Sequence, residues 1–402
     1  VRSHDKLLRA TSMGQHCSQA EPQHQPGLAM LNIGVLLQKA TAKPAESNRL
    51  VEAFVSDSAS GRRYLLGRNE HAAQVMQAIE IDGIIDDYAA SGTHWNNKPV
   101  ITTEQLPERA MVVNCAMCIA PVSAARRLQH HDGIELLSLA DLCGHLPQRF
   151  KLPWFVSQSR DEVSSHLSAW NKLYGALADE ASQQTLKDLL QFRLSGDYHS
   201  MSAYCVRPEA QYFEPFIDPG AAHVFVDGGG YDGDTTEAFC HRYPDYRKVY
   251  LFEPSITNLA NARRRLQQQR DIVFIDQGLS DQQGQLPFNA EAGSASAVDP
   301  HSSQQIRVTT LDQHVSTKIS FIKMDLEGWE LQALHGARRH ILEERPNLAI
   351  AVYHQAADFR TIFEYITGLC PDYRVYLRHY TEGWSETIMY FIPADSHQPR
   401  AC

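Results

Sequence analysis

Short apolar runs, each ending in a polar residue, recur through the C-terminal half of the chain. Stretches with the spacing of helices lie between them. Apolar runs of four to eight residues that alternate with helices are typical of parallel strands buried on both faces of a sheet. The pattern therefore predicts an α/β architecture with a mostly parallel sheet. The predicted strands are residues 224–227, 249–253, 272–276, 319–325 and 348–354.

Two more extended runs lie close to the end of the chain. Residues 373–380 and 386–393 flank Gly383 and Trp384. Two extended runs joined by a short turn favour an antiparallel pair, which we place at the edge of the sheet. Such an ending is unusual for a dinucleotide-binding sheet.

The first half of the chain carries a second, shorter βαβ pattern. An apolar run at 64–67 precedes helical spacing at 71–79, and a run at 83–87 ends in two aspartates. Strand patterns follow at 98–101 and 110–114, which together predict a smaller Rossmann-like α/β domain and, after it, bridging helices. The expected division is 1–50 as a loose segment, 51–158 as this domain, 159–205 as a helical bridge and linker, and 206–402 as the larger domain.

Charge and cysteine usage narrow the class of protein. The chain has 47 Asp and Glu against 37 Lys and Arg, so it offers no overall basic field to nucleic acid or anionic membrane. No apolar stretch reaches the roughly 18 uninterrupted residues of a membrane span. Eight scattered cysteines suit free thiols in a reducing cytoplasm, and we interpret Cys115 and Cys118 as buried thiols, not as a redox pair. A cytoplasmic globular protein is expected.

A glycine-rich motif follows the first strand of the C-terminal half, reading Asp227-Gly-Gly-Gly-Tyr-Asp-Gly-Asp-Thr-Thr. As Gly228-x-Gly230-x-x-Gly233 it fits the fingerprint of a dinucleotide site. Glu253 then lies about where that fold places the acid that binds a ribose. An NAD(P)-dependent oxidoreductase is one function that this alternative allows.

The same motif also fits a second pattern, Asp227-x-Gly229-x-x-x-Gly233, which is similar to the glycine loop of class I S-adenosylmethionine-dependent methyltransferases. The side chains of Asp227 and Asp232 favour this alternative. A pyrophosphate binds helix-end N–H groups and is repelled by nearby anions, whereas two carboxylates suit a ligand with an amino group and a sulfonium.

Six segments of the C-terminal half carry a family resemblance. They are Phe225-Val-Asp-Gly-Gly-Gly, Phe252-Glu-Pro, Gly278-Leu-Ser-Asp, Thr310-Leu-Asp, Ile322-Lys-Met-Asp-Leu-Glu-Gly-Trp-Glu and Leu334-His-Gly-Ala. With these segments, residues 206–395 resemble the FkbM family of methyltransferases. One departure is Val352, where family members often place a Glu. The resemblance implies a class I methyltransferase fold and methyl transfer from S-adenosylmethionine, usually to a hydroxyl oxygen of a sugar, polyketide or similar metabolite.

The expected cofactor is therefore S-adenosylmethionine, bound at the carboxyl ends of the first strands. A carboxylate such as Glu253 can accept hydrogen bonds from both hydroxyls of a ribose. The candidate cofactor-binding residues are Asp227, Gly228, Gly229, Gly230, Gly233, Asp234, Thr235, Glu253, Pro254, Asp276 and Gln277.

Candidate catalytic residues lie at the ends of the fourth and fifth strands. An alcohol that attacks a methyl group needs a base, and Asp325, Glu327 and His354 can face the same point there. We expect Asp325 or Glu327 to be that base, with His354 as the competing base and Lys323 steadying one carboxylate. We expect no metal; the alternative is that Asp325, Glu327 and His354 together bind Mg²⁺ or Mn²⁺.

The N-terminal domain is similar to nucleotide-sugar-type Rossmann-like domains that precede some sugar-modifying enzymes, but its turn is poor in glycine. The turn reads Gly67-Arg68-Asn69-Glu70-His71, with one glycine and a carboxylate where a phosphate would bind. We therefore expect a domain that keeps the fold and binds no dinucleotide.

Three classes of function remain at this point: a small-molecule O-methyltransferase, which we favour, an NAD(P)-dependent oxidoreductase, and a two-domain protein that binds a metabolite without turnover. We expect a hydroxylated small molecule as partner, no nucleic acid and no membrane, and the sequence leaves a homo-oligomer open.

Overall fold

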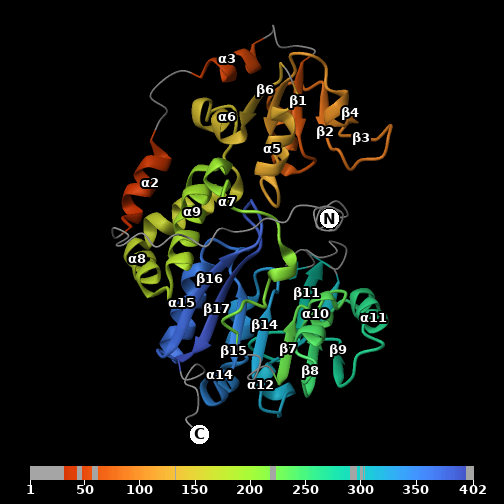
Figure 1. Cartoon of the computed structure of the whole chain (residues 1–402), viewed down its shortest axis with the longest axis vertical. Helices are drawn as coiled ribbons and strands as arrows, with labels where there is room; N and C mark the ends of the chain where they lie inside the picture. The colour runs from red at the N-terminus through yellow and green to blue at the C-terminus, as the bar shows by residue number, and fades with distance from the viewer. Residues whose placement is uncertain are drawn as a thin grey trace.

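The computed structural model describes residues 31–42, 48–56, 62–131, 133–217, 223–289, 297–298, 302 and 304–394. Over these ranges the molecule is elongated, with one main sheet towards each end and a group of helices beside and between them (Figure 1). The N-terminal sheet is at the top of this view and the C-terminal sheet at the bottom. No described helix combines the length and the apolar character needed to cross a bilayer.

Six strands form the N-terminal sheet, in the order β3-β4-β2-β1-β5-β6. Neighbouring strands are parallel except β3 with β4. The predicted α/β character is confirmed, although sequence analysis missed β3, β6, α5 and α6. Its elements are β1 (Arg63–Leu66), α4 (Glu70–Ala78), β2 (Gly83–Ile85), β3 (His94–Trp95), β4 (Lys98–Ile101), η2 (Thr103–Gln105), β5 (Met111–Asn114), α5 (Pro121–Gln129), β6 (Glu135–Ser138) and α6 (Leu139–His145).

Three helices connect the two sheets: α7 (Trp154–Ser165), α8 (Leu167–Ala176) and α9 (Glu180–Ser195). Apolar side chains of these predicted bridging helices are buried, including Trp170 on α8 and Leu189 on α9. Helix α2 (Ile33–Thr41) packs against all three. Its Ile33 is fully buried, so this helix is anchored on the bridging helices. Helix α3 (Arg49–Val55) contacts α6, and residues 1–30 lie outside the described part.

After α9 the chain passes through η3 (Tyr198–Met201) and η4 (Pro208–Ala210) before it enters the C-terminal sheet. This sheet has the strand order β16-β17-β15-β14-β7-β8-β9, and β17 is antiparallel to both of its neighbours. The predicted parallel strands and the antiparallel edge pair are confirmed. The strands are β7 (Val224–Gly228), β8 (Lys248–Phe252), β9 (Ile272–Ile275), β14 (Phe321–Met324), β15 (Asn347–Ala351), β16 (Tyr373–His379) and β17 (Thr387–Pro393).

Helices connect the strands of this sheet as the alternation of the sequence predicted. They are α10 (Asp234–Arg242), α11 (Ile256–Arg265), α12 (Leu311–His314), α13 (Glu330–His335), α14 (Arg338–Glu344) and α15 (Asp358–Leu369). A small sheet between β9 and β14 was not predicted. It has the order β10-β13-β11-β12 and is built from β10 (Gly278–Leu279), β11 (Gly284–Asn289), β12 (Ala297–Val298) and β13 (Gln305–Thr309).

In each main sheet the strand order reverses at a central pair. The chain first adds strands on one side of β1 or β7, and then returns to the other side to form β5 or β14. Ligands of open α/β sheets bind outside the carboxyl ends of the strands at such a reversal. The architecture therefore contains two candidate ligand-binding edges.

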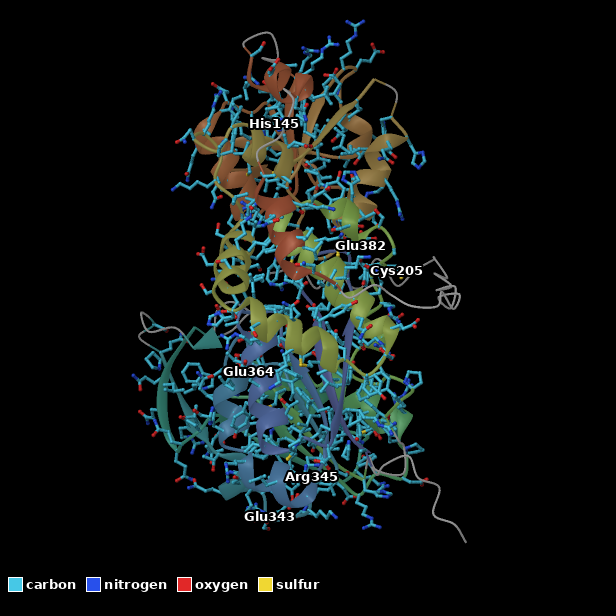
Figure 2. The ribbon with its side chains drawn as sticks, turned by 90° about the vertical axis from the view of Figure 1, so that its left-hand side faces the viewer. His145, Cys205, Glu343, Arg345, Glu364 and Glu382 are labelled. Carbon is cyan, nitrogen blue, oxygen red and sulfur yellow. The ribbon has the colours of Figure 1, made fainter. Side chains whose placement is uncertain are left out.

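The turn between β16 and β17 contacts the N-terminal part through its main chain. The Glu382 amide donates to the Ile119 carbonyl at 2.7 Å, and the Trp384 amide donates to the Met117 carbonyl at 3.1 Å. A Cβ atom on Gly383 would lie 2.0 Å from the carbonyl oxygen of Cys118, so only glycine permits this approach. Figure 2 labels Glu382 at the level where the two parts meet.

Candidate functional site

The two ligand-binding edges open into one cavity of about 770 Å³. The loops after β1, β2 and β5 line it from the N-terminal part. The loops after β7, β14 and β15 line it from the C-terminal part, together with the β16–β17 turn and residues 208–213. Groups from both sheets can therefore act on a molecule bound in this cavity.

The glycine loop after β7 is packed so closely that side chains are excluded. A Cβ atom on Gly229, whose φ is +75°, would lie 2.0 Å from the carbonyl oxygen of Asp325. A Cβ atom on Gly230 would lie 2.4 Å from Leu251, and Gly233 also has a positive φ of +85°. The glycines therefore allow this loop to pack tightly against Leu251 and the end of β14, which fixes its backbone.

Asp227 and Lys323 form a buried ion pair beneath this loop. The Lys323 ammonium donates to Oδ1 of Asp227 at 3.0 Å, and the Thr236 hydroxyl donates to Oδ2 at 2.7 Å. Lys323 also donates to the carbonyl oxygens of Gly228 and Gly229. Asp227, a candidate cofactor-binding residue, is fully buried beneath these contacts. Sequence analysis placed Lys323 beside a catalytic carboxylate, whereas in the structure it pairs with Asp227 and, through the two carbonyls, fixes the loop.

Glu253 lies just past β8 and is also buried. Its carboxylate accepts hydrogen bonds from the amide of Tyr231 at 3.0 Å and from the amide of Ser255 at 2.8 Å. Burial raises the pKa of Glu253 to about 7, although these hydrogen bonds oppose the shift. The hydrogen bonds of Glu253 therefore offset only part of the cost of burying its carboxylate. Each carboxylate oxygen can accept more than one hydrogen bond, so Glu253 can still accept bonds from the two hydroxyls of a ligand diol.

Of the remaining candidate cofactor residues, two line the cavity and three lie outside its lining. Asp234 and Thr235 line the cavity at the start of α10. Asp276 is exposed and forms an ion pair with Arg307 of the small sheet, and Gln277 is half-buried beside it. Pro254 follows Glu253 and lies against Gly278, where an added Cβ atom would contact its ring.

The structure brings together the three predicted catalytic side chains. Nε2 of His354 lies 3.4 Å from Oδ1 of Asp325 and 3.4 Å from Oε2 of Glu327. All three residues line the cavity. Glu327 has a positive φ of +53°, a conformation that non-glycine residues rarely adopt and that is often found at functional sites.

His354 is held as a cation by the carboxylates around it. Burial alone would lower the pKa of His354, but Glu330, Glu327 and Asp325 raise it to about 10. Nδ1 of the ring lies 3.1 Å from Oε1 of the fully buried Glu330. This charge favours a carboxylate over His354 as the base, because a protonated imidazole has no lone pair to accept a proton.

The two carboxylates in contact with His354 have different surroundings. Tyr212 donates from its hydroxyl to Asp325 at 2.6 Å, and the Tyr353 hydroxyl lies 3.4 Å from the same carboxylate. Glu327 has His354 as its charged neighbour. Burial, followed by the negative charges nearby, raises the pKa of Glu327 to about 8 despite the opposing charge of His354. A base with a pKa near the working pH is well matched to proton abstraction.

Sequence reasoning missed several residues of this cluster, among them Tyr212 and Glu386. Tyr212 comes from a connector without strand or helix periodicity, and Glu386 comes from the β16–β17 turn. Glu386 accepts a hydrogen bond from Gln211 at 2.8 Å, and its pKa is raised to about 7 by burial and then by Asp325. The acid in the turn could have been noticed as a candidate, but no local signal links Tyr212 to β14.

The cluster could also surround a cation. One ligand atom from each of Asp325, Glu327 and His354 lies within 4.8 Å of the others, and Glu330, His354 and Asp358 form a second such group. Carboxylate oxygens with one imidazole suit Mg²⁺ or Mn²⁺ only loosely. The metal-dependent alternative is therefore tested below against the metal-free one.

On the N-terminal side, the predicted strand-end acids are paired with arginines. Arg68 donates to Oδ2 of Asp86 at 2.7 Å, and Nε of Arg127 lies 3.3 Å from Oδ2 of Asp87. All four residues line the cavity. Cys118 also lines it, but burial raises the pKa of its thiol to about 12, which agrees with an unreactive thiol.

Comparisons with known proteins agree with this description. Residues 227–381 match the family model described as Methyltransferase FkbM domain. The crystal structure of Methyltransferase FkbM from Methylobacillus flagellatus KT is similar over 89% of this chain and 98% of that chain, with 23% identity and a TM-score of 0.69. No curated protein matches the chain.

Two other solved structures are similar to a smaller part of the chain. The match to an rRNA methylase from Streptococcus thermophilus covers 42% of this chain and 86% of the methylase chain. The identity is 19% and the TM-score 0.29. The match to Aeropyrum pernix fibrillarin with natively bound S-adenosyl-L-methionine covers 43% of this chain and 66% of the fibrillarin chain. The identity is 11% and the TM-score 0.29.

Proposed function

We propose that this chain, whose residues 227–381 form an FkbM methyltransferase domain, is an S-adenosylmethionine-dependent O-methyltransferase for a hydroxyl group of a sugar or other small metabolite. The observation that carries the proposal is the position of Glu327, a carboxyl with a raised pKa in the cavity that the glycine loop also lines. An alcohol needs such a base when it attacks a methyl group.

The residues at the C-terminal edge fit the cofactor. Close packing at Gly229 and Gly230 fixes the backbone of the loop, and Gly229 lines the cavity. Glu253 is the candidate partner of the ribose hydroxyls, and Asp234 and Thr235 line the cavity next to the loop. Bound S-adenosylmethionine would supply a methyl group that its sulfonium sulfur has already activated for transfer.

The chain contributes positioning and proton removal. Glu327 accepts the proton of the acceptor hydroxyl, and the cationic His354 holds this carboxylate in place. Asp325 is fixed by the phenol of Tyr212 and supports the orientation of His354. The rate of an in-line displacement depends mainly on how well the reacting groups are aligned. These contacts therefore speed the reaction by fixing Glu327 in position, in addition to its role in accepting the proton.

A binding experiment and a turnover experiment test the proposal. S-adenosylhomocysteine at saturation should raise the Tm of the full chain, while NAD(H) should leave it unchanged. Labelled S-adenosylmethionine should then transfer its methyl group to members of a panel of sugars and hydroxylated metabolites. Stabilisation by NAD(H) alone would favour the oxidoreductase, and binding of a panel metabolite without any methyl transfer would favour the binding protein.

A further inference from the structure

We infer that the ligand-binding edge of the N-terminal sheet holds the methyl acceptor, a neutral polyhydroxylated molecule, and that the imidazole of His71 hydrogen-bonds to it. The inference rests on the proposed function, because it concerns the other half of the same cavity. It assigns to the N-terminal domain the part of the acceptor that is not methylated.

Topology provides the first argument. The strand order of the N-terminal sheet reverses between β1 and β5, and the loops after these two strands line the cavity. The reversal between β7 and β14 lies at the opposite wall. A molecule that spans the cavity therefore contacts the ligand-binding edges of both sheets.

His71 provides the second, independent argument. It lies in the first turn of α4, lines the cavity and is only 3% exposed. Neither ring nitrogen has a hydrogen-bond partner among the described residues. Nε2 is 3.6 Å from Oε1 of Glu70, which is too long for a hydrogen bond. Buried polar groups are nearly always paired, so these nitrogens indicate a ligand that pairs them.

The Arg–Asp pairs indicate the chemistry of that ligand. Arg68 and Arg127 each use part of the guanidinium on an aspartate, and each side chain remains partly exposed at the cavity, at 27% and 41%. Each pair places donors and acceptors side by side. A hydroxyl group donates one hydrogen bond and accepts others, so it can use both members of a pair.

The charge of the N-terminal wall opposes a phosphorylated acceptor. Its two arginines are already paired with Asp86 and Asp87, and Glu70 adds a further carboxylate. A phosphate at this wall would meet net negative charge. Aromatic rings, including Tyr88 and Trp384, add apolar faces of the kind on which a sugar ring can lie.

The test uses a panel of neutral methyl glycosides and disaccharides together with the matching sugar phosphates. Binding to the full chain is measured by saturation-transfer NMR and calorimetry in the presence of S-adenosylhomocysteine. The variants are His71→Phe, which keeps the ring packed against Phe155, and Arg127→Gln; Gln77→Ala, exposed on the same helix, is the matched control.

We expect a neutral glycoside to bind the wild type, and both His71→Phe and Arg127→Gln to weaken it about 5- to 10-fold while the S-adenosylhomocysteine affinity stays constant. His71→Phe should retain or raise the Tm, because it removes two unpaired buried nitrogens. Unchanged glycoside binding in His71→Phe, tighter binding of the phosphates, or no glycoside binding at all would overturn the inference. Failure of S-adenosylhomocysteine to bind the wild type would instead refute the proposed function, and the inference with it.

Discussion

The two ligand-binding edges share an architecture but present different surfaces. The C-terminal edge presents backbone: Gly229 and Gly230 leave no space for a Cβ atom. The N-terminal edge presents side chains, and its turn has a single glycine, Gly67, where an added Cβ atom would make only ordinary contacts of 3.4–3.6 Å. In the proposed arrangement, the C-terminal sheet binds its ligand against its main chain, and the N-terminal sheet binds its ligand through side chains.

This difference separates two tasks that a transferase must perform. A common cofactor can be bound by backbone groups that do not vary with side-chain identity. An acceptor has to be distinguished from similar molecules, which requires side chains such as those of Arg68 and Arg127. The experiments below test this separation, from the largest expected effect to the smallest.

Replacing Glu327, the proposed base, should have the largest effect. We expect Glu327→Gln to reduce methyl transfer by about 10²–10⁴-fold, because the amide cannot accept the hydroxyl proton, while the affinity for S-adenosylhomocysteine changes little. In the wild type the rate should rise with pH and level off above about 8, since Glu327 acts only when deprotonated. Steady-state kinetics over a pH series would measure both effects.

Two comparisons control this experiment. Glu209→Gln changes an exposed carboxylate in the wall of the same cavity and should alter turnover less than about threefold. Chelator should leave wild-type activity intact; loss of activity that Mg²⁺ or Mn²⁺ restores, with partial rescue of Asp325→Asn and His354→Ala, would establish the metal-dependent alternative. Near-wild-type turnover in Asp325→Asn, Glu327→Gln and His354→Ala would place the chemistry elsewhere.

The glycine loops should respond differently to the same added methyl group. Gly229→Ala should lower the free energy of unfolding by about 3 kcal/mol, because the Cβ atom would collide with the backbone of Asp325 and the residue has a positive φ. Gly67→Ala has only the conformational cost and should lower it by about 1 kcal/mol. Chemical denaturation measures both, and equal losses would remove the distinction between the two edges.

The buried carboxyls of the C-terminal edge predict an unusual pH dependence of stability. Burial raises the pKa of Glu253 and Glu386 to about 7 and that of Glu327 to about 8. The folded state therefore prefers their protonated forms, and the stability they contribute below about pH 4.5 is lost as pH rises through 7–8. Glu386→Gln should reduce this fall by about 1–2 kcal/mol. Asp276→Asn changes an exposed ion pair and should leave the dependence of the free energy of unfolding on pH unchanged. Urea titrations from pH 5 to 8 measure this free energy for each variant.

The smallest expected effect is the response to dinucleotides. NAD(H) should not change the Tm of the full chain, because the N-terminal turn offers a single glycine and places Glu70 beside the site of a phosphate. The contrary result would be that NAD or a nucleotide-sugar binds with micromolar affinity and that Glu70→Gln makes this binding tighter. The N-terminal edge would then be a dinucleotide site.

Periodicity was sufficient to predict most of the two sheets. Buried parallel strands in this chain are continuous apolar runs, and the acids after β2, β8 and β14 mark where the strands end. The small sheet after β9 was missed because its strands β10 and β12 have two residues each, and β11 contains Pro287, which disfavours a strand assignment.

The candidate site was only partly predictable, because burial is not a local property. Sequence reasoning placed Asp325, Glu327 and His354 together correctly, since all three follow adjacent strands. It could not show that Asp227 is covered by Thr236, or that carboxylates on three sides keep His354 protonated. Both outcomes depend on which side chains tertiary packing brings within a few ångströms.

The turn between β16 and β17 has a thermodynamic consequence. It carries the backbone contacts of Glu382 and Trp384 to the N-terminal part, and three residues after Gly383 it carries Glu386 of the site. A ligand that shifts this turn from one side must change the energy of binding on the other. Linkage requires the coupling to be reciprocal, so an acceptor that tightens cofactor binding is itself bound more tightly by the cofactor-loaded protein, by the same factor.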